Sequence, residues 1–220
     1  MTPPERVTTV VINFQTPDLT QRAVHSFRQA YPAVPLILLD NGSRDRSTDV
    51  LRSFAEHDPH ARFIANPANR HHGPAMDQGL RLAETPFVLF LDSDCTVTKK
   101  GFIEQMLVLL DQRAEHYAAG KKTWMNDRGF DVPESPSAHP YIRPICMLLR
   151  RTTYCGLPPF ERHGAPCLRN MQAAVRSGHI LMHFPVEDFV VHKGRGTAER
   201  YGYRLGLRGK LNHLLNKLGF

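Results

Sequence analysis

The sequence predicts an α/β fold in which a mostly parallel central sheet has helices on both of its faces. Four apolar runs, at residues 7–13, 36–39, 62–65 and 87–91, have the length of buried strands. The segments between them carry apolar residues at helical spacing, and strands that alternate with helices form parallel sheets. Because ligands of open α/β sheets bind beyond the carboxyl ends of the strands, we expect the functional site at that edge.

The first strand and the first helix are marked by their residue types. Residues 7–13 are rich in β-branched side chains, which favour strands. Thr16 is a suitable N-cap, and Pro17 suits the first helical position. A helix is therefore predicted from there to about Ala30, and Pro32 follows it as a helix breaker.

The next two units repeat this order of strand and helix. After residues 36–39, the turn sequence Asp-Asn-Gly-Ser at residues 40–43 leads to a helix that Ser47 is suited to cap. The third strand, at residues 62–65, is followed by a short helix at residues 73–84. The first 95 residues therefore predict the parallel part of the sheet.

The second half of the chain is less regular. We expect an amphipathic helix at residues 102–117 and then, at residues 121–144, a loop with four prolines and no clear period. Irregular segments of this length are typically functional, and we expect this one to close over the site as a lid. The remaining elements are a helix at residues 165–176 and short strands at residues 145–149, 180–184 and 189–191.

Composition places the chain among soluble globular proteins. The 220 residues include no run long enough to span a bilayer, and the N-terminus has no apolar stretch of signal-peptide length. The four cysteines are scattered, as expected for free thiols in a reducing cytoplasm. We therefore expect one cytoplasmic domain over residues 1–197, followed by a basic amphipathic tail over residues 198–220.

Two acids, Asp92 and Asp94, end the apolar run that begins at Phe87. Carboxylates at the end of a buried strand lose solvation unless a positive group meets them. One interpretation is a divalent metal ion with a phosphorylated ligand. The alternative is that the acids end the strand and cap the next segment, because Asp is common in turns and at N-caps.

Four motifs at predicted strand ends follow one another in a fixed order. They are Val-Ile-Asn-Phe-Gln-Thr at 11–16, Leu-Leu-Asp-Asn-Gly-Ser at 38–43, Asn-Arg-His-His-Gly-Pro-Ala-Met-Asp-Gln-Gly at 69–79 and Phe-Leu-Asp-Ser-Asp at 90–94. Together they resemble the nucleotide-sugar half of a family 2 glycosyltransferase of the GT-A fold. Later in the chain, Val-Val-His-Lys-Gly-Arg-Gly-Thr at 190–197 is similar to the family's late strand. His71 and His72 depart from the glycine and the aromatic residue that are common in the family.

The resemblance implies a GT-A type, Rossmann-like sandwich with a donor-nucleotide half at residues 1–119 and an acceptor half at residues 120–197. It implies transfer of a hexose, with inversion, from a UDP- or dTDP-sugar. The acceptor would be a glycan, a lipid-linked molecule or a small molecule, as in the synthesis of cell-envelope polysaccharide. Mn²⁺ or Mg²⁺ would neutralise the charge that develops on the diphosphate leaving group.

The resemblance assigns the metal site to Asp94 and His192. Asp94 would be a direct ligand, and Asp92 would lie nearer the ribose and the water shell of the metal. Ser93 would also belong to the donor site. Mn²⁺ accepts imidazole more readily than Mg²⁺ does. A histidine at a strand end can equally be structural, so both interpretations of His192 stay open.

Six further residues are assigned to the donor by the resemblance. Asp40 would accept a hydrogen bond from the base, which favours uracil or thymine, although Asp-Asn-Gly-Ser is also strong turn sequence. Arg70 would contact the diphosphate or the base, and Asp77 would hold sugar hydroxyls unless it lies on a solvated helix face. The nucleoside pocket would be lined by Asn13, Phe14 and Thr16, with core packing as the alternative for Phe14.

A general base for the acceptor hydroxyl is harder to place. Family members commonly carry an acid at the start of the late helix, where this chain has Pro166 and Cys167. Glu161 and His163 are the nearest candidates, and Glu161 can equally be a surface charge. More distant alternatives are Asp127, Asp131, Glu134, Glu187 and Asp188.

Two other functions stay open, and the missing acid admits the first of them. A nucleotide- or glycan-binding module with a decayed active site would bind the same ligands without turnover. A sugar-phosphate nucleotidyltransferase shares the fold type, but it should carry a glycine-rich loop with Arg and Lys after the first strand. Residues 14–17, Phe-Gln-Thr-Pro, contain none of these residue types.

The positive charge of the chain is concentrated near its C-terminus. The formal net charge is +7, and residues 193–220 carry seven Lys and Arg against one Glu. Such a tail suits a polyanionic neighbour, while the lack of zinc-finger spacing and RNP-like aromatics argues against nucleic acid. It would either lie on the inner face of the membrane near lipid-linked acceptors, or pack on the domain or on the partner in a homodimer.

Overall fold

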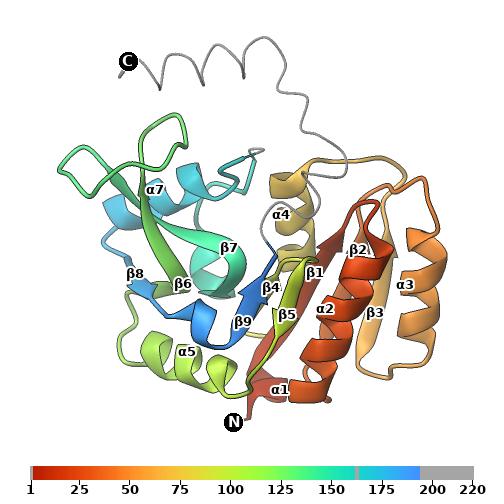
Figure 1. Cartoon of the computed structure of the whole chain (residues 1–220). Coiled ribbons are helices and arrows are strands. Elements are labelled where there is room, and N and C mark those ends of the chain that lie inside the picture. The colour runs from red at the N-terminus through yellow and green to blue at the C-terminus, as the bar shows by residue number, and fades with distance from the viewer. Residues whose placement is uncertain (1, 162–163, 194–220) are drawn as a thin grey trace.

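Figure 1 shows the chain in the computed structural model, which describes residues 2–161 and 164–193. The candidate base His163 and the predicted tail at residues 198–220 lie outside the described residues. Within the described part of the chain, no helix has both the length and the apolar character needed to cross a membrane.

A seven-stranded sheet forms the centre of the molecule. In spatial order, its strands are β3 (Ala61–Ala65), β2 (Leu36–Asp40), β1 (Val7–Asn13), β4 (Phe87–Leu91), β7 (His139–Arg150), β6 (His116–Met125) and β8 (Ile180–His183). The first four are parallel to one another, whereas β7 runs antiparallel to both β4 and β6. The chain leaves β1 toward β2 and later returns to β4 on the other side, so the boundary between β1 and β4 is a switch point where such sheets bind ligands.

Helices cover both faces of this sheet (Figure 1). One face carries α2 (Pro17–Ala30), α3 (Ser47–Glu56) and α5 (Phe102–Asp111), and the other carries α4 (His72–Leu82), α6 (Arg151–Tyr154) and α7 (Leu168–Arg176). Two short helices complete the described elements, α1 (Pro3–Arg6) and the 3₁₀ helix η1 (Val186–Asp188). The predicted fold class, a mostly parallel α/β sandwich, is confirmed.

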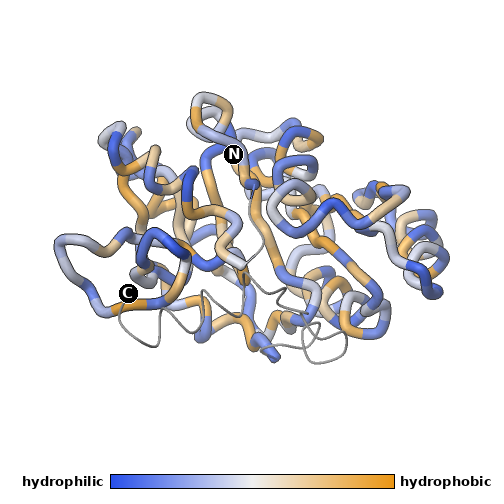
Figure 2. The backbone as a smooth tube through the Cα atoms, turned by 90° about the horizontal axis from the view of Figure 1, so that it is seen from above, coloured by the Kyte–Doolittle hydropathy of each residue, from blue (hydrophilic) through white to orange (hydrophobic). Residues whose placement is uncertain are grey.

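The central strands are buried on both faces. All five residues of β4 are buried: Phe87, Leu89 and Leu91 join one hydrophobic cluster, whereas Val88 and Phe90 join the other. Burial on both faces explains why the sequence shows an unbroken apolar run instead of alternation. Apolar stretches of the chain accordingly concentrate along the central strands (Figure 2).

A second, two-stranded sheet lies on the same side as α2. It pairs β5 (Cys95–Val97) antiparallel to β9 (Val190–His192), in a register that sets Cys95 opposite His192. The amide of Lys193 also donates to the carbonyl of Asp94 at 3.2 Å. Because β5 begins one residue after Asp94, this pairing brings the end of the described chain to the end of β4.

Two boundaries predicted from helical patterns are wrong. The helix that begins at Phe102 ends at Asp111, and the chain then turns into β6, so the helix predicted at residues 102–117 is too long. Apolar residues continue past the helix because β6 is itself a buried strand. Ser47 is the first residue of α3 rather than its N-cap, which is Arg46.

The segment at residues 121–144 is not an irregular loop. It forms most of a long hairpin between β6 and β7, and only residues 126–138 connect the two strands. Pro140 and Pro144 lie in β7, and proline is uncommon within strands, so the residue pattern concealed this hairpin. Closure of this hairpin over the site stays a prediction. The division into a donor half and an acceptor half at residue 120 also stays a prediction, and that residue lies inside β6.

Arg6 and Asp111 form an ion pair that ties the N-terminal segment to α5. The two guanidinium nitrogens Nη1 and Nη2 each lie 2.7 Å from a carboxylate oxygen of Asp111. These hydrogen bonds lower the pKa of Asp111 and raise the pKa of Arg6. Since folding lowers the pKa of the acid, the stabilisation is complete above its ordinary value of 3.8 and is lost as pH falls through the lowered value.

Asp111→Asn is therefore expected to reduce the free energy of unfolding by about 0.5–1 kcal/mol at neutral pH, because the pair is partly exposed. Urea unfolding of both proteins at neutral pH and at about pH 3 measures this effect. The difference between the two proteins should shrink at the lower pH. An equal difference at both pH values would show that the charge of Asp111 is not the cause.

Candidate active site

The carboxyl ends of β1, β2 and β4 lie side by side at one edge of the sheet. The strand register pairs Asn13, at the end of β1, with Asp40, at the end of β2. Asp92 follows β4 directly, and its amide donates to the carbonyl of Ile145 in β7 at 2.9 Å. Polar side chains from distant parts of the sequence therefore gather at the switch point of the sheet.

Asp92, Asp94 and His192 form a compact cluster at this edge. One potential ligand atom from each residue lies within 4.8 Å of the other two. His192 Nε2 is 3.0 Å from Asp94 Oδ1 and 4.0 Å from Asp92 Oδ2. Ser93, between the two acids, is buried. The end of β4 positions the acids and the pairing of β5 with β9 positions the histidine, so the structure brings these predicted site residues together.

The charges in this cluster are strongly perturbed. Burial, and then the nearby charge of Asp94, raises the pKa of Asp92 to about 7, while His192 opposes the shift. The hydrogen bond to Asp94 raises the pKa of His192 above its ordinary value, against the effect of burial. Two neighbouring carboxylates are favoured in their charged form only when positive charge lies close to them.

The donor atoms of the cluster fit a small divalent cation. Carboxylate oxygens are the ligands that Mg²⁺ and Mn²⁺ prefer, and imidazole nitrogen is well suited to Mn²⁺. Binding would displace the protons that the raised pKa values of Asp92 and His192 favour, because metal ligands must be deprotonated. The three side chains are therefore chemically suited to hold a cation.

Asn13 and Asp40 form a buried hydrogen-bonded centre beneath the edge. Asn13 Nδ2 donates to Asp40 Oδ1 at 2.8 Å, and Asn13 Oδ1 accepts from the Thr20 hydroxyl at 2.7 Å. Asp40 also accepts from the hydroxyls of Ser43 and Thr48, at 2.5 and 2.8 Å. A carboxylate offers about four acceptor positions, and three are already used here. Recognition of a base by Asp40 stays a prediction, and the base would have to use the remaining acceptor position.

The segment between β1 and α2 holds the other residues assigned to the nucleoside pocket. Thr16 is the N-cap residue of α2, is fully buried, and its hydroxyl donates to Asn13 Oδ1 at 3.3 Å. Phe14 is half-buried. Gln15 has a left-handed φ of 56°, held by a 2.8 Å hydrogen bond from its amide to the Ser43 hydroxyl. Such strain in a non-glycine residue is typical of functional sites.

An amide network that the sequence analysis missed fixes the loop before α4. Asn41 Nδ2 donates to Asn69 Oδ1 at 3.1 Å, and Asn41 Oδ1 accepts from Asn66 Nδ2 and from the amide of Arg70, each at 3.1 Å. Asn66 and Gln78 exchange two hydrogen bonds at 2.9 Å. The Arg70 side chain itself is exposed, so its predicted contact with the donor stays a prediction. Side-chain amides have no periodic signature, which is why no pattern disclosed the network.

Asp77 lies on α4 and is engaged by two other side chains. The Tyr154 hydroxyl donates to its Oδ1 at 2.6 Å, and Arg81 Nε lies 2.9 and 3.1 Å from its two oxygens. The predicted contact of Asp77 with sugar hydroxyls stays a prediction, and a sugar would have to share the carboxylate with these partners.

The acceptor side has no acid at the start of α7. Cys167 is fully buried there, and burial raises the pKa of its thiol, so it is unsuited to act as a base. Glu161 is half exposed and pairs with Arg169 at 3.0 Å. In the β6–β7 hairpin, Asp131 pairs with Arg143, whose charge slightly opposes the rise in the pKa of His192. This ion pair of the hairpin therefore lies within electrostatic range of the cluster.

His72 is a residue at this edge to which the sequence analysis gave no role. It is the first residue of α4, and its Nε2 lies 3.9 Å from Asp92 Oδ1. His192 approaches the other oxygen of the same carboxylate, so two imidazoles flank Asp92. In the sequence, only the paired histidines at residues 71 and 72 indicated that this position could have a role.

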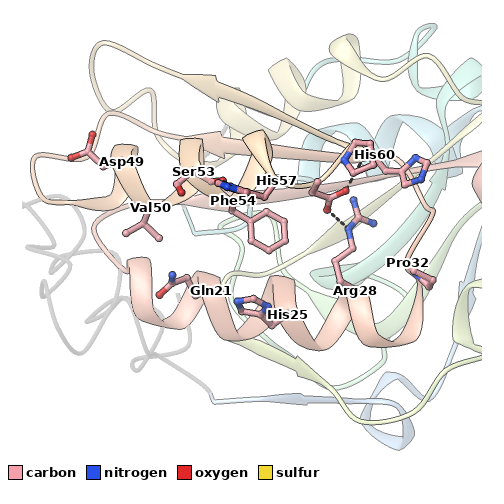
Figure 3. Close-up of a pocket in the computed structure, with 12 residues that line it drawn as sticks. Gln21, His25, Arg28, Pro32, Asp49, Val50, Ser53, Phe54, His57 and His60 are labelled. Atoms are coloured by element: carbon pink, nitrogen blue, oxygen red, sulfur yellow. Dashed lines mark hydrogen bonds and ion pairs between the residues drawn. The ribbon is translucent and has the colours of Figure 1, made fainter.

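A separate groove lies between α2 and α3 (Figure 3), with a volume of about 820 Å³. His25, His57 and His60 line it, together with the ion pair between Arg28 and Asp58. Of the described residues assigned to the donor, the metal or the base, none lines this groove. It is therefore distinct from the edge where the acids and His192 meet.

Solved structures similar to this chain share its architecture. A mannosyltransferase from Pyrobaculum calidifontis, PcManGT in complex with GDP-Man and Mn²⁺, has a TM-score of 0.64 at 14% identity, over 82% of this chain and 55% of its own. S. aureus TarS 1-349 in complex with UDP-GlcNAc has a TM-score of 0.63 at 14% identity, over 90% of this chain and 61% of its own. Identity this low shows the fold alone, and the fold defines the chain as a GT-A protein.

Sequence comparison gives the family. Residues 8–171 match the model of glycosyl transferase family 2, and the chain belongs to that family. An uncharacterized glycosyltransferase of Haemophilus influenzae is 28% identical over 92 residues. That match covers 42% of this chain and 37% of the relative, so the chain spans well under half the length of this relative. The predicted resemblance to family 2 glycosyltransferases is confirmed.

Proposed function

We propose that the protein transfers a sugar from a nucleoside-diphosphate donor to an acceptor, with a divalent cation held by Asp92, Asp94 and His192. The observation that carries the proposal is this cluster at the carboxyl end of β4, where two acids and an imidazole converge. When bound, the cation supplies the positive charge that a diphosphate leaving group requires. Mn²⁺ is the preferred candidate because one ligand is a nitrogen.

The residues of the chain supply binding and orientation in this proposal. The buried centre of Asn13 and Asp40 fixes the shape of the edge on which the nucleoside would lie, with Phe14 beside the base. For a UDP- or dTDP-linked donor, the ring N–H of uracil or thymine would have to reach the remaining acceptor position of Asp40, which is 1% exposed. The solved structures of similar fold were obtained with GDP-Man and with UDP-GlcNAc, so guanine nucleotides belong in the test.

The acceptor side carries the less specific part of the proposal. We infer an inverting transfer of a hexose to a glycan, lipid-linked or small-molecule acceptor of the cell envelope, on the cytoplasmic side. Glu161 or His163 would take the proton of the acceptor hydroxyl. Association with a membrane surface or with a second copy through residues 198–220 belongs to the same proposal.

A second candidate function is a binding module without turnover. It is favoured by one observation, the buried Cys167 at the position where the family commonly carries an acid. Such a protein would keep the donor edge and the cation cluster, but it would lack a group able to accept the proton of the acceptor. The two functions therefore differ in turnover and agree in binding.

Calorimetry with UDP, dTDP and GDP, with and without Mn²⁺, tests the donor site, and a hydrolysis assay with the matching nucleotide sugars tests turnover. The proposal predicts binding of at least one nucleotide that depends on Mn²⁺, together with slow release of sugar. Binding without release favours the module. Absence of binding to all three nucleotides would contradict both functions.

A further inference from the structure

We propose that His72 contacts the diphosphate of the donor and that Asn41 is the positioning residue that holds His72 in place. The inference rests on the proposed function and adds a specific residue pair to it. Neither residue was assigned a role from the sequence. His72 lies beside Asp92, and hydrogen bonds hold the loop that precedes it.

His72 lies beside Asp92 at the edge of the cation cluster. Its Nε2 lies 3.9 Å from Asp92 Oδ1, while His192 Nε2 lies 4.0 Å from Asp92 Oδ2. The side chain of His72 is 32% exposed, so part of the ring remains accessible to a ligand. It projects from α4, on the opposite side of the carboxylate from the β5–β9 pair that positions His192.

The chemistry of this position matches a diphosphate. An imidazole carries at least one N–H donor in every protonation state, and phosphate oxygens are strong acceptors. A donor bound through a cation at Asp92 and Asp94 would place its diphosphate next to these acids, where a hydrogen-bond donor is needed to offset repulsion. His72 is an accessible donor from α4 at that place.

The backbone just before His72 is strained. His71 has a left-handed φ of 68°, a conformation that side-chain-bearing residues rarely adopt. Its amide donates to Asn69 Oδ1 at 2.7 Å, and its carbonyl accepts from Asn41 Nδ2 at 3.3 Å. A strained conformation persists where the surroundings impose it, so these hydrogen bonds set the direction in which α4 begins.

Asn41 connects this strained turn to the rigid sheet. Only 3% of Asn41 is exposed, and its amide donates to the carbonyl of Asn13 at 2.8 Å. Its Nδ2 serves both Asn69 Oδ1 and the carbonyl of His71, while its Oδ1 accepts from Asn66 and the amide of Arg70. Both ends of this side chain contact the loop, but only the Nδ2 end contacts His71, the residue directly before His72, so a substitution can remove that donor and keep the acceptor.

Calorimetry of UDP at saturating Mn²⁺, with GDP as the probe if it is the nucleotide that binds, tests His72. We expect His72→Ala to weaken binding about tenfold or more, through loss of a hydrogen bond to a charged group. His72→Gln, which returns an N–H near the position of Nε2, should restore most of the affinity. Binding of Mn²⁺ alone should be unchanged in both variants, because His72 is assigned to the diphosphate and not to the cation.

Asn41→Asp tests the positioning role. It keeps the acceptor at Oδ1 and removes the Nδ2 donor, and we expect it to weaken nucleotide binding as His72→Ala does. In a protein that already carries His72→Ala, Asn41→Asp should add less than a further twofold loss, because both changes remove the same contact. His60→Ala, in the groove between α2 and α3, is the matched control and should bind as the wild type does.

Each outcome decides one part of the inference. Unchanged nucleotide affinity in His72→Ala would overturn the contact with the diphosphate, and weaker binding of Mn²⁺ alone would reassign His72 to the cation. Multiplicative losses in the double variant would overturn the positioning role of Asn41. A wild-type protein that binds no nucleotide would contradict the proposed function itself. Thermal unfolding of every variant excludes loss of the fold as the cause, and His72 can be tested even if the Asn41 variant unfolds.

Discussion

Asp94→Asn is expected to weaken Mn²⁺-dependent binding of UDP by more than about 100-fold and to abolish sugar release. Loss of residues that merely orient metal ligands typically costs about 10–100-fold, and a direct ligand should cost more. The substitution keeps the shape of a side chain that is 9% exposed and removes its charge. It relieves repulsion with Asp92 but also weakens the hydrogen bond to His192, so thermal unfolding of the metal-free protein is measured beside binding.

Calorimetry and the hydrolysis assay, performed on the same preparation, measure this effect. Asp49→Asn is the matched control, because Asp49 is an exposed carboxylate of α3 that lines the groove between α2 and α3. It removes the same charge and should leave binding and turnover unchanged. Wild-type affinity for Mn²⁺ and UDP in Asp94→Asn would exclude Asp94 as a ligand.

Gly42→Ala is expected to destabilise the fold by about 2–5 kcal/mol, the sum of a left-handed backbone and overpacking. Gly42 has a φ of +78°, and a Cβ there would lie 2.3 Å from the carbonyl carbon of Ala68. That atom belongs to the backbone, which cannot rotate away as a side chain can. The loop after β2 and the loop before α4 touch at this point, so the affinity for nucleotide should fall as well.

Urea unfolding of Gly42→Ala and Gly178→Ala separates the two contributions. Gly178 also has a left-handed φ, of +84°, but a Cβ there would meet nothing within 4 Å. Gly178→Ala should therefore show only the backbone cost, about 1–2 kcal/mol. Equal destabilisation of the two variants would show that the close contact between a Cβ at residue 42 and the backbone of Ala68 does not reduce the free energy of unfolding.

The parallel half of the sheet was predictable because its signals are local. The strand at residues 7–13 and the helix that ends at Ala30 are bounded by β-branched runs, an N-cap and prolines, and the structure reproduces them. β5 was missed because three residues are too few for a periodic pattern. β6 and β7 were missed or shortened because their strand character comes from pairing with each other, against the preferences of Pro140 and Pro144.

The candidate site was predictable only where a motif marks it. The two acids follow an apolar run, and the resemblance added His192, although about 100 residues separate it from them and only the pairing of β5 with β9 explains their contact. The three hydrogen bonds that Asp40 accepts from Asn13, Ser43 and Thr48 could not be predicted, because hydrogen-bond partners depend on side-chain directions. The same holds for the amide network around Asn41.

The closure of β9 onto β5 has a consequence for the unfolded chain. A cation bound to Asp94 and His192 would link two points about 100 residues apart, and the unfolded chain would have to close that long loop before it could hold the ion at both residues. The ion would thus act as a reversible cross-link of the native state as well as a cofactor. Its affinity for the native state would add directly to the free energy of unfolding, so thermal stability would rise with Mn²⁺ concentration even without nucleotide.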